Sequence, residues 1–134
     1  MFKKLISTLF GKKENESHAP IDPTQLHRML RIGVLDEDVI DPNSDEIEKA
    51  LKQLEALRCE DNTYAILEVP NSEFNFIQTL FDEDSITLEF QKSDTEEQYS
   101  TTIKDTKKII EVFRKYNEGN TSWKNNFDWK EVGY

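Results

Sequence analysis

Carboxylate clusters are the first residues in this sequence that could do chemistry. Asp41 follows the run Asp36–Asp38, and a second run is Asp82–Asp84. Carboxylates in such numbers can bind calcium, but a calcium loop needs alternating oxygen ligands, a central glycine and a distal glutamate. Neither cluster has that pattern, and 27 acidic residues make chance adjacency common. We interpret both clusters as solvated turns.

Other kinds of reaction centre find little support. The single Cys59 has no plausible base nearby in sequence, and neither His18 nor His27 has a second histidine three or four residues away. The four glycines form no phosphate-binding loop, and no serine lies in a nucleophile elbow. The sequence therefore predicts no metal, no cofactor and no enzyme. A small hydrolase stays a third hypothesis, because catalytic groups can converge from distant positions.

Charge limits the kinds of partner. The chain has 17 basic and 27 acidic residues, a net charge of −10, and its first 13 residues hold four lysines and no acid. Residues 14–134 therefore carry a net charge of −14. Such a body repels phosphate backbones, which disfavours nucleic acid, and attracts a basic protein. The alternative is that the acidity only keeps a small protein soluble.

Residues 1–23 are predicted to be a basic amphipathic segment and a linker ahead of a single domain at 24–134. An apolar stripe at helical spacing is flanked by lysines, so it could bind an anionic membrane surface. The residues that would do so are Phe2, Lys3, Lys4, Leu5, Ile6, Leu9, Phe10, Lys12 and Lys13. The alternatives are that this helix docks on the protein's own core or is a partly ordered tail, since three turns give marginal anchoring alone.

The expected location is the cytoplasm, or the inner face of the membrane if the amphipathic segment binds there. No run approaches the roughly 20 apolar residues of a spanning helix, and no secretory pattern precedes a small-residue cleavage site. The lone cysteine agrees with a reducing compartment. At 134 residues the chain is long enough to bury a sizeable core.

The stretch from Thr63 to Ile103 predicts a four-stranded antiparallel meander, the centre of an α+β fold. Residues 85–91 and 98–103 alternate apolar and polar side chains. Residues 64–69 and 74–81 have apolar side chains at both odd and even positions, so both faces of these strands are expected to be buried and the strands to be central. The connections are too short for a parallel crossover. One face of the sheet must then be covered by helices.

Two main helices are expected over that face. Asn43 with Glu46 three residues later matches a capping box before the first, near 44–57. Asp105 or Thr106 caps the second, near 105–118, which Gly119 ends. A short helix is also expected from Thr24, and 34–42 is expected to be irregular. The last twelve residues hold four aromatics, which should fold back onto the core.

The predicted outer face of the sheet is where a partner could bind. Alternation places Glu89 and Gln91 away from the core side of their strand, and Gln78 with Phe76 is expected to share that face on the neighbouring strand. The acidic turn at the end of these strands completes the surface. The predicted partner-binding residues are Phe76, Gln78, Asp82, Glu83, Asp84, Glu89 and Gln91. The alternative is that this polar face is merely hydrated.

A pattern in the second half of the chain is similar to that of a known group. Phe76-Ile77-Gln78-Thr79 and Leu88-Glu89-Phe90-Gln91 are followed by aromatic and glycine positions at Phe113, Tyr116, Gly119, Trp123 and Trp129. From Tyr64 onward this resembles small bacterial single-domain proteins that look like immunity proteins of polymorphic toxin systems. The resemblance implies a cytoplasmic, non-catalytic protein that binds and neutralises a toxin. The acidic body would suit a basic toxin such as a nuclease.

The lysine-rich N-terminal segment departs from a plain cytoplasmic binder. It supports a second hypothesis, a membrane-peripheral adaptor whose sheet domain presents a docking face. Removal of residues 1–13 separates the two hypotheses. If the truncated protein loses membrane association but still protects against the toxin, the segment is an accessory tail. If the full-length protein is found in the cytosol, the adaptor hypothesis is excluded.

Overall fold

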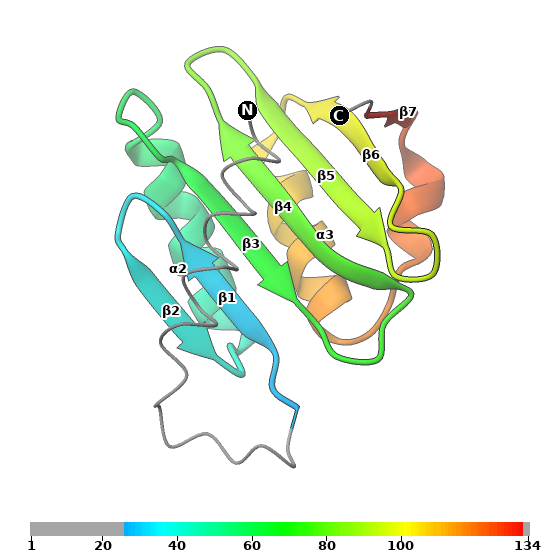
Figure 1. Ribbon diagram of the computed structural model, residues 1–134. Coiled ribbons are helices and arrows are strands. Elements are labelled where there is room, and N and C mark those ends of the chain that lie inside the picture. Colours follow the sequence, from blue (N-terminus) through cyan, green and yellow to red (C-terminus); the bar gives the residue numbers. More distant parts are fainter. Residues whose placement is uncertain (1–25, 133–134) are drawn as a thin grey trace.

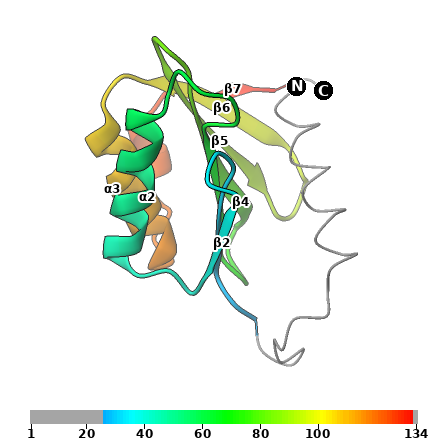
Figure 2. The ribbon, with the colours of Figure 1, turned by 90° about the vertical axis from the view of Figure 1, so that its left-hand side faces the viewer.

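The computed structural model describes residues 26–132 as an antiparallel sheet of seven strands with two helices packed on one face (Figure 1, Figure 2). The strands run in the spatial order β2-β1-β3-β4-β5-β6-β7, so β3, β4 and β5 are central. The elements in chain order are β1 (Met29–Ile32), β2 (Glu37–Ile40), α2 (Ser44–Ala56), β3 (Tyr64–Glu68), β4 (Phe74–Phe81), β5 (Ile86–Lys92), β6 (Gln98–Ile103), α3 (Thr106–Asn117), the 3-10 helix η1 (Ser122–Asn126) and β7 (Lys130–Glu131).

The predicted four-stranded sheet is wrong. The four expected strands are present as β3 to β6 and form the expected meander, and the α+β class holds. However, β1 and β2 extend the sheet beyond β3, and β7 extends it beyond β6. The sheet is therefore wider than the regular part of the sequence pattern indicated.

Strand β1 forms where a short helix was predicted. Leu30 and Ile32 join the core under the helices, while Met29 and Arg31 lie on the opposite face, and all four are buried. Pairing with β2 on one side and β3 on the other satisfies the backbone of β1, whereas a helix of two turns is marginal in water. Strand β2 forms within the stretch 34–42, which was predicted to be irregular. It forms because a tight turn at 33–36 folds the chain back along β1, where its backbone can pair.

A register shift in β4 brings the first residue of this strand to the core side of the sheet. The pairing of β4 with β5 shifts between Phe74 and Phe76. As a result, Phe74 joins the core cluster together with Ile77 although the two are three residues apart. Phe76 is buried on the opposite face, outside that cluster.

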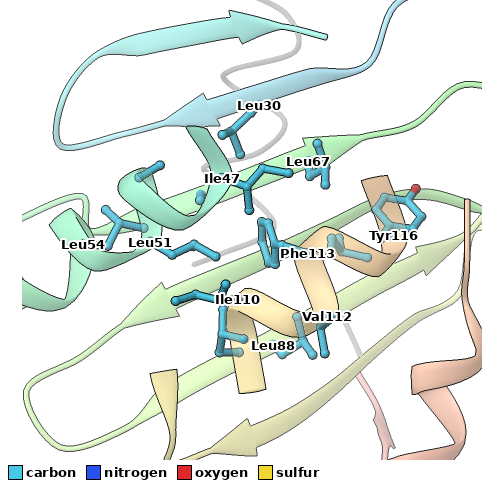
Figure 3. Packing of buried hydrophobic residues seen from close by; sticks show 14 of the residues in the cluster. Leu30, Ile47, Leu51, Leu54, Leu67, Leu88, Ile110, Val112, Phe113 and Tyr116 are labelled. Carbon is cyan, nitrogen blue, oxygen red and sulfur yellow. The ribbon is translucent and has the colours of Figure 1, made fainter. Parts of the chain in front are cut away.

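The two helices begin at the predicted caps and cover the sheet with apolar stripes. The Asn43 side chain accepts a hydrogen bond from the Glu46 N–H at 2.8 Å, and the Glu46 carboxylate accepts one from the Asn43 N–H at 2.9 Å. Asp105 caps α3, and Gly119 follows it at a φ of +85°, which glycine adopts without strain. The buried residues of the helices are Ile47, Ala50, Leu51 and Leu54 of α2 and Thr106, Ile109, Ile110, Val112, Phe113, Tyr116 and Asn117 of α3 (Figure 3).

The aromatic C-terminal stretch closes one end of the core, as predicted, through Trp123, Phe127 and Trp129. The fourth predicted aromatic, Tyr134, lies outside the described residues. The Trp123 side chain is 2% exposed, and its ring centroid lies 5.6 Å from that of Phe74 and 6.1 Å from that of Trp129. Both indole N–H groups donate to backbone carbonyls, Trp123 to Asn120 at 2.9 Å and Trp129 to Lys124 at 2.6 Å. These bonds satisfy the polar edges of the rings while their apolar faces pack.

Because of Tyr116, the free energy of unfolding should depend on pH in the alkaline range. Burial raises its pKa to about 12, against an ordinary value of 10.0. Its hydroxyl donates to the Phe74 carbonyl at 2.8 Å. Stability is therefore full below about pH 10 and falls as the pH rises toward about 12, because only the unfolded chain ionises there. Denaturant titrations between pH 8 and pH 12 should show this decline shrinking in Tyr116→Phe, which loses about 1 kcal/mol at neutral pH. An unchanged alkaline decline in the variant would contradict the assignment.

The membrane prediction concerns residues that the structure does not describe. Among residues 26–132, no helix has the length and apolar character to cross a membrane. The stretch Phe2–Gly11 and the linker up to Pro23 lie outside this range. Membrane binding through Phe2 to Lys13 therefore stays a prediction.

Candidate partner-binding surface

The predicted outer-face residues of β4 and β5 do share one face. Phe76 pairs with Gln91, and Gln78 pairs with Glu89, in the register between the two strands. The Gln78 amide donates to the Glu89 carboxylate at 2.7 Å. The Asn75 amide also reaches across the strands and donates to Gln91 at 2.8 Å. The structure thus brings together Phe76, Gln78, Glu89 and Gln91 on the face opposite α2 and α3.

Burial separates these residues from the acidic turn predicted alongside them. Gln78 is 0%, Phe76 3% and Glu89 5% exposed, and only Gln91 is half-buried. The Gln78–Glu89 hydrogen bond therefore lies inside the molecule, where it pairs the Gln78 amide N–H with a carboxylate that would be costly to bury alone. In contrast, Asp82, Glu83 and Asp84 are exposed at the end of β4. Of the predicted surface, the turn is the part that a partner can reach directly.

Arg31 is a buried cation on the same face that sequence reasoning missed. Its Nε lies 3.7 Å from a carboxylate oxygen of Glu68, and the register places it opposite Asp38 on β2. A buried guanidinium needs nearby negative charge to offset its desolvation. The alternation of Leu30 and Ile32 around Arg31 was the available signal, but four residues are too few to separate a strand from a helical stripe.

Three acidic connections converge at one end of the sheet, an arrangement that the sequence did not reveal. The turn between β1 and β2, the loop between α2 and β3 and the turn between β4 and β5 all lie at this end (Figure 1). We call the exposed carboxylates of these connections and of the start of β2 the acidic end, and its members are Asp36, Glu37, Asp38, Glu60, Asp61, Asp82, Glu83 and Asp84. The two carboxylate runs that read as separate solvated turns are thus parts of one surface.

Backbone hydrogen bonds hold these connections side by side. The Gly33 N–H donates to the Tyr64 carbonyl at 3.0 Å, and the Phe81 N–H donates to the Thr63 carbonyl at 2.9 Å. Asp36 and Asn62 adopt φ values of 50° and 62°. Aspartate and asparagine tolerate this left-handed region better than most residues, so the turn sequences fit their sharp geometry. The spacing of the acidic connections is therefore fixed by the sheet itself.

The basic side chain of Arg58 binds the turn between β4 and β5 at the acidic end. Its Nε donates to the Asp82 carbonyl at 2.7 Å, and its Nη2 donates to the Ser85 carbonyl at 3.2 Å. The guanidinium also lies 5.8 Å from the centroid of the Phe81 ring. The Arg58 side chain thus binds only backbone carbonyls of the turn, and the Asp82–Asp84 carboxylates stay exposed to solvent.

Replacement of Gly33 should loosen the acidic end. A Cβ at this position would lie 2.1 Å from the Tyr64 ring and 2.7 Å from the Asn62 carbonyl. Gly33→Ala therefore forces the first turn away from the neighbouring loop, at a cost of about 1–3 kcal/mol. Urea denaturation measures the loss, and amide exchange at Tyr64 should rise. Gly119→Ala separates the two kinds of cost: a Cβ there meets nothing within 4 Å, so any loss of stability comes from the φ of +85° and not from a clash. Unchanged stability in Gly33→Ala would refute the close approach.

No metal or acid–base centre emerges from the described geometry. Within residues 26–132, no group of three or more His, Cys, Asp or Glu side chains could hold a metal ion. His27 lies ahead of β1 and bonds to Asp41 at 2.7 Å, which lowers the pKa of that carboxyl. A groove between α2 and α3 holds Glu48 and Glu111, but hydrogen bonds from Lys52 and Lys115 lower their pKa values. Both carboxylates are thereby held ionised and suited to ion pairing.

No family model, no curated protein and no solved structure matches this chain. The main feature of the described surface is the acidic end, with its eight exposed carboxylates and the Arg58 guanidinium bound to backbone carbonyls of one turn. Such a surface can bind and orient a cationic protein.

Proposed function

We propose that this protein is a non-catalytic binding domain that neutralises a basic toxin, such as a nuclease, in the cytoplasm. The observation that carries the proposal is the acidic end, formed by three connections from separate parts of the chain. A nuclease must present a positive surface to its phosphate-bearing substrate. A partner with a dense negative surface can occupy that positive surface and block it.

The acidic end suits fast capture of such a toxin. Long-range attraction between opposite charges raises association rates, and it does so most at low ionic strength. The carboxylates are placed by backbone hydrogen bonds of the sheet, so few conformations are lost when a partner binds. Within the predicted site, Asp82–Asp84 would make the first contact, while Phe76, Gln78, Glu89 and Gln91 lie behind this rim on the second face of the sheet.

Affinity capture followed by a protection assay tests the proposal. The tagged full-length protein is purified from its own host, its bound proteins are identified by mass spectrometry, and the neighbouring genes are read alongside. We expect a basic toxin domain, and co-expression should relieve the growth arrest that this toxin causes. A recovered toxin that still arrests co-expressing cells would contradict neutralisation.

The same capture distinguishes the peripheral adaptor. Recovery of membrane proteins or lipid alone would favour that second candidate and the N-terminal residues Phe2 to Lys13. Deletion of residues 1–13 then supplies the control. Toxin protection should persist in truncated protein that stays folded and monomeric, because the acidic end lies wholly within the described domain.

A further inference from the structure

The sheet face opposite α2 and α3 carries an apolar patch. Figure 2 shows both helices on the other face, and no helix within residues 26–132 lies over the patch. The strand registers place five side chains there, which we call the second-face patch: Met29, Tyr64, Ile66, Phe76 and Leu80. A patch of this kind on a bare surface would promote association.

The patch is nevertheless buried. Ile66 is 0% exposed, and Met29, Tyr64 and Phe76 are each less than a tenth exposed. None of these four belongs to the core cluster between the sheet and the helices. Their burial therefore requires a second apolar layer, on the opposite side of the sheet from the first.

We propose that residues 2–13 of this same chain form that layer. Their stripe of Phe2, Leu5, Ile6, Leu9 and Phe10 supplies the apolar side chains that such a layer needs. The lysines that flank the stripe would meet a face that holds Asp38, Glu68 and Glu89, with Arg31 opposite Asp38 and close to Glu68. Apolar content and charge are thus complementary between the segment and the second-face patch.

The connecting chain is long enough for this docking. Twelve residues, 14–25, separate the segment from the start of the described domain. Extended, they span up to about 40 Å, whereas five neighbouring strands cover only about 19 Å. The described chain also enters the sheet at β1, which contributes Met29 to the patch.

Docking of the segment has a consequence for the whole molecule. The stripe that would bind a membrane is the stripe that covers the patch, so the two contacts exclude each other. The docked state also keeps Gln78 and Glu89 out of reach of a partner. This inference does not rest on toxin binding, because its observations are the burial of the second-face patch and the composition of residues 2–13.

Paramagnetic broadening in the full-length chain tests the docking. In a Cys59→Ser background, a nitroxide attached at Ser7→Cys should weaken the amide signals of β3 and β4 around Ile66 and Gln78. Signals on the outer surfaces of α2 and α3 should keep their intensity. Broadening that is absent from β3 and β4 would overturn the proposal. So would broadening that arises only when spin-labelled protein is mixed with isotope-labelled protein, because a second copy would then be the occupant.

Paired variants test the apolar stripe itself. The double variant Leu5→Glu with Leu9→Glu should abolish the broadening and increase the fluorescence of 1-anilinonaphthalene-8-sulfonate. The control is Ser7→Glu with Thr8→Glu, two positions off the stripe, with the nitroxide attached at Lys3→Cys instead. This control should change neither the broadening nor the fluorescence. Broadening that persists unchanged in Leu5→Glu with Leu9→Glu would overturn the role of the stripe.

Discussion

Trp123→Ala should remove about 3–5 kcal/mol from the free energy of unfolding, as truncation of a buried aromatic usually does. The expected loss is large because this ring contacts four other aromatic rings. Its centroid lies 5.6 Å from that of Phe74, 6.2 Å from that of Phe90, 6.4 Å from that of Tyr116 and 6.1 Å from that of Trp129. The truncation therefore leaves a cavity between the sheet, α3 and the C-terminal stretch. Urea denaturation followed by far-ultraviolet circular dichroism measures the loss.

Phe127→Ala is the matched control for this prediction. Phe127 comes from the same stretch but is only half-buried, and its closest described ring partner is Trp129 at 5.8 Å. Its truncation should cost clearly less than that of Trp123. Equal losses would mean that the whole C-terminal stretch contributes through its attachment to the sheet, and that the Trp123 cluster has no special weight.

The helices and the central meander could be predicted because their signals are local. The Asn43 capping box, the Asp105 cap and Gly119 each act within a few residues, and each is present as expected. Alternation in β5 indicated that Glu89 lies opposite the core side, and the β4 register then placed Gln78 beside it. These features need only sequence spacing and standard helix and strand geometry.

The outer strands could not be predicted because their partners are distant in sequence. Strand β1 pairs with β3 some 35 residues later, and β7 pairs through only Lys130 and Glu131 with Tyr99 and Ser100 in the first half of β6. Four residues such as Met29–Ile32 fit a helical stripe as well as an alternating strand until the neighbouring backbone is known. Tertiary pairing therefore decided the structure of this segment over local preference.

The acidic end escaped prediction for a related reason. The sequence shows its carboxylates as three separate groups, at 36–38, 60–61 and 82–84. They become neighbours only because the sheet is antiparallel: the end of β1 and the end of β4 both lie beside the start of β3. Conversely, the burial of Gln78 and Phe76 was missed because alternation identifies the two faces of a strand but does not say whether the second face is covered.

Neutralisation of the turn at Asp82–Asp84 should slow association with a basic toxin about tenfold at low salt, since electrostatic steering raises association rates by factors of 10 to 10³. The variant combines Asp82→Asn, Glu83→Gln and Asp84→Asn, and stopped-flow mixing measures the rate. Dissociation should change less, because exposed charges act mainly on encounter. The difference should shrink in concentrated salt, where the screening length falls to about 3 Å.

A second acidic turn separates the effect of location from that of net charge. Asp94, Glu96 and Glu97 lie between β5 and β6, at the opposite end of the sheet (Figure 1). Neutralisation of these three residues changes the net charge of the protein by the same amount. If the acidic end is the binding surface, the control should associate nearly as fast as the natural protein. If both variants are slowed equally, only the total charge of −10 matters, and the acidic end loses its role as the docking surface.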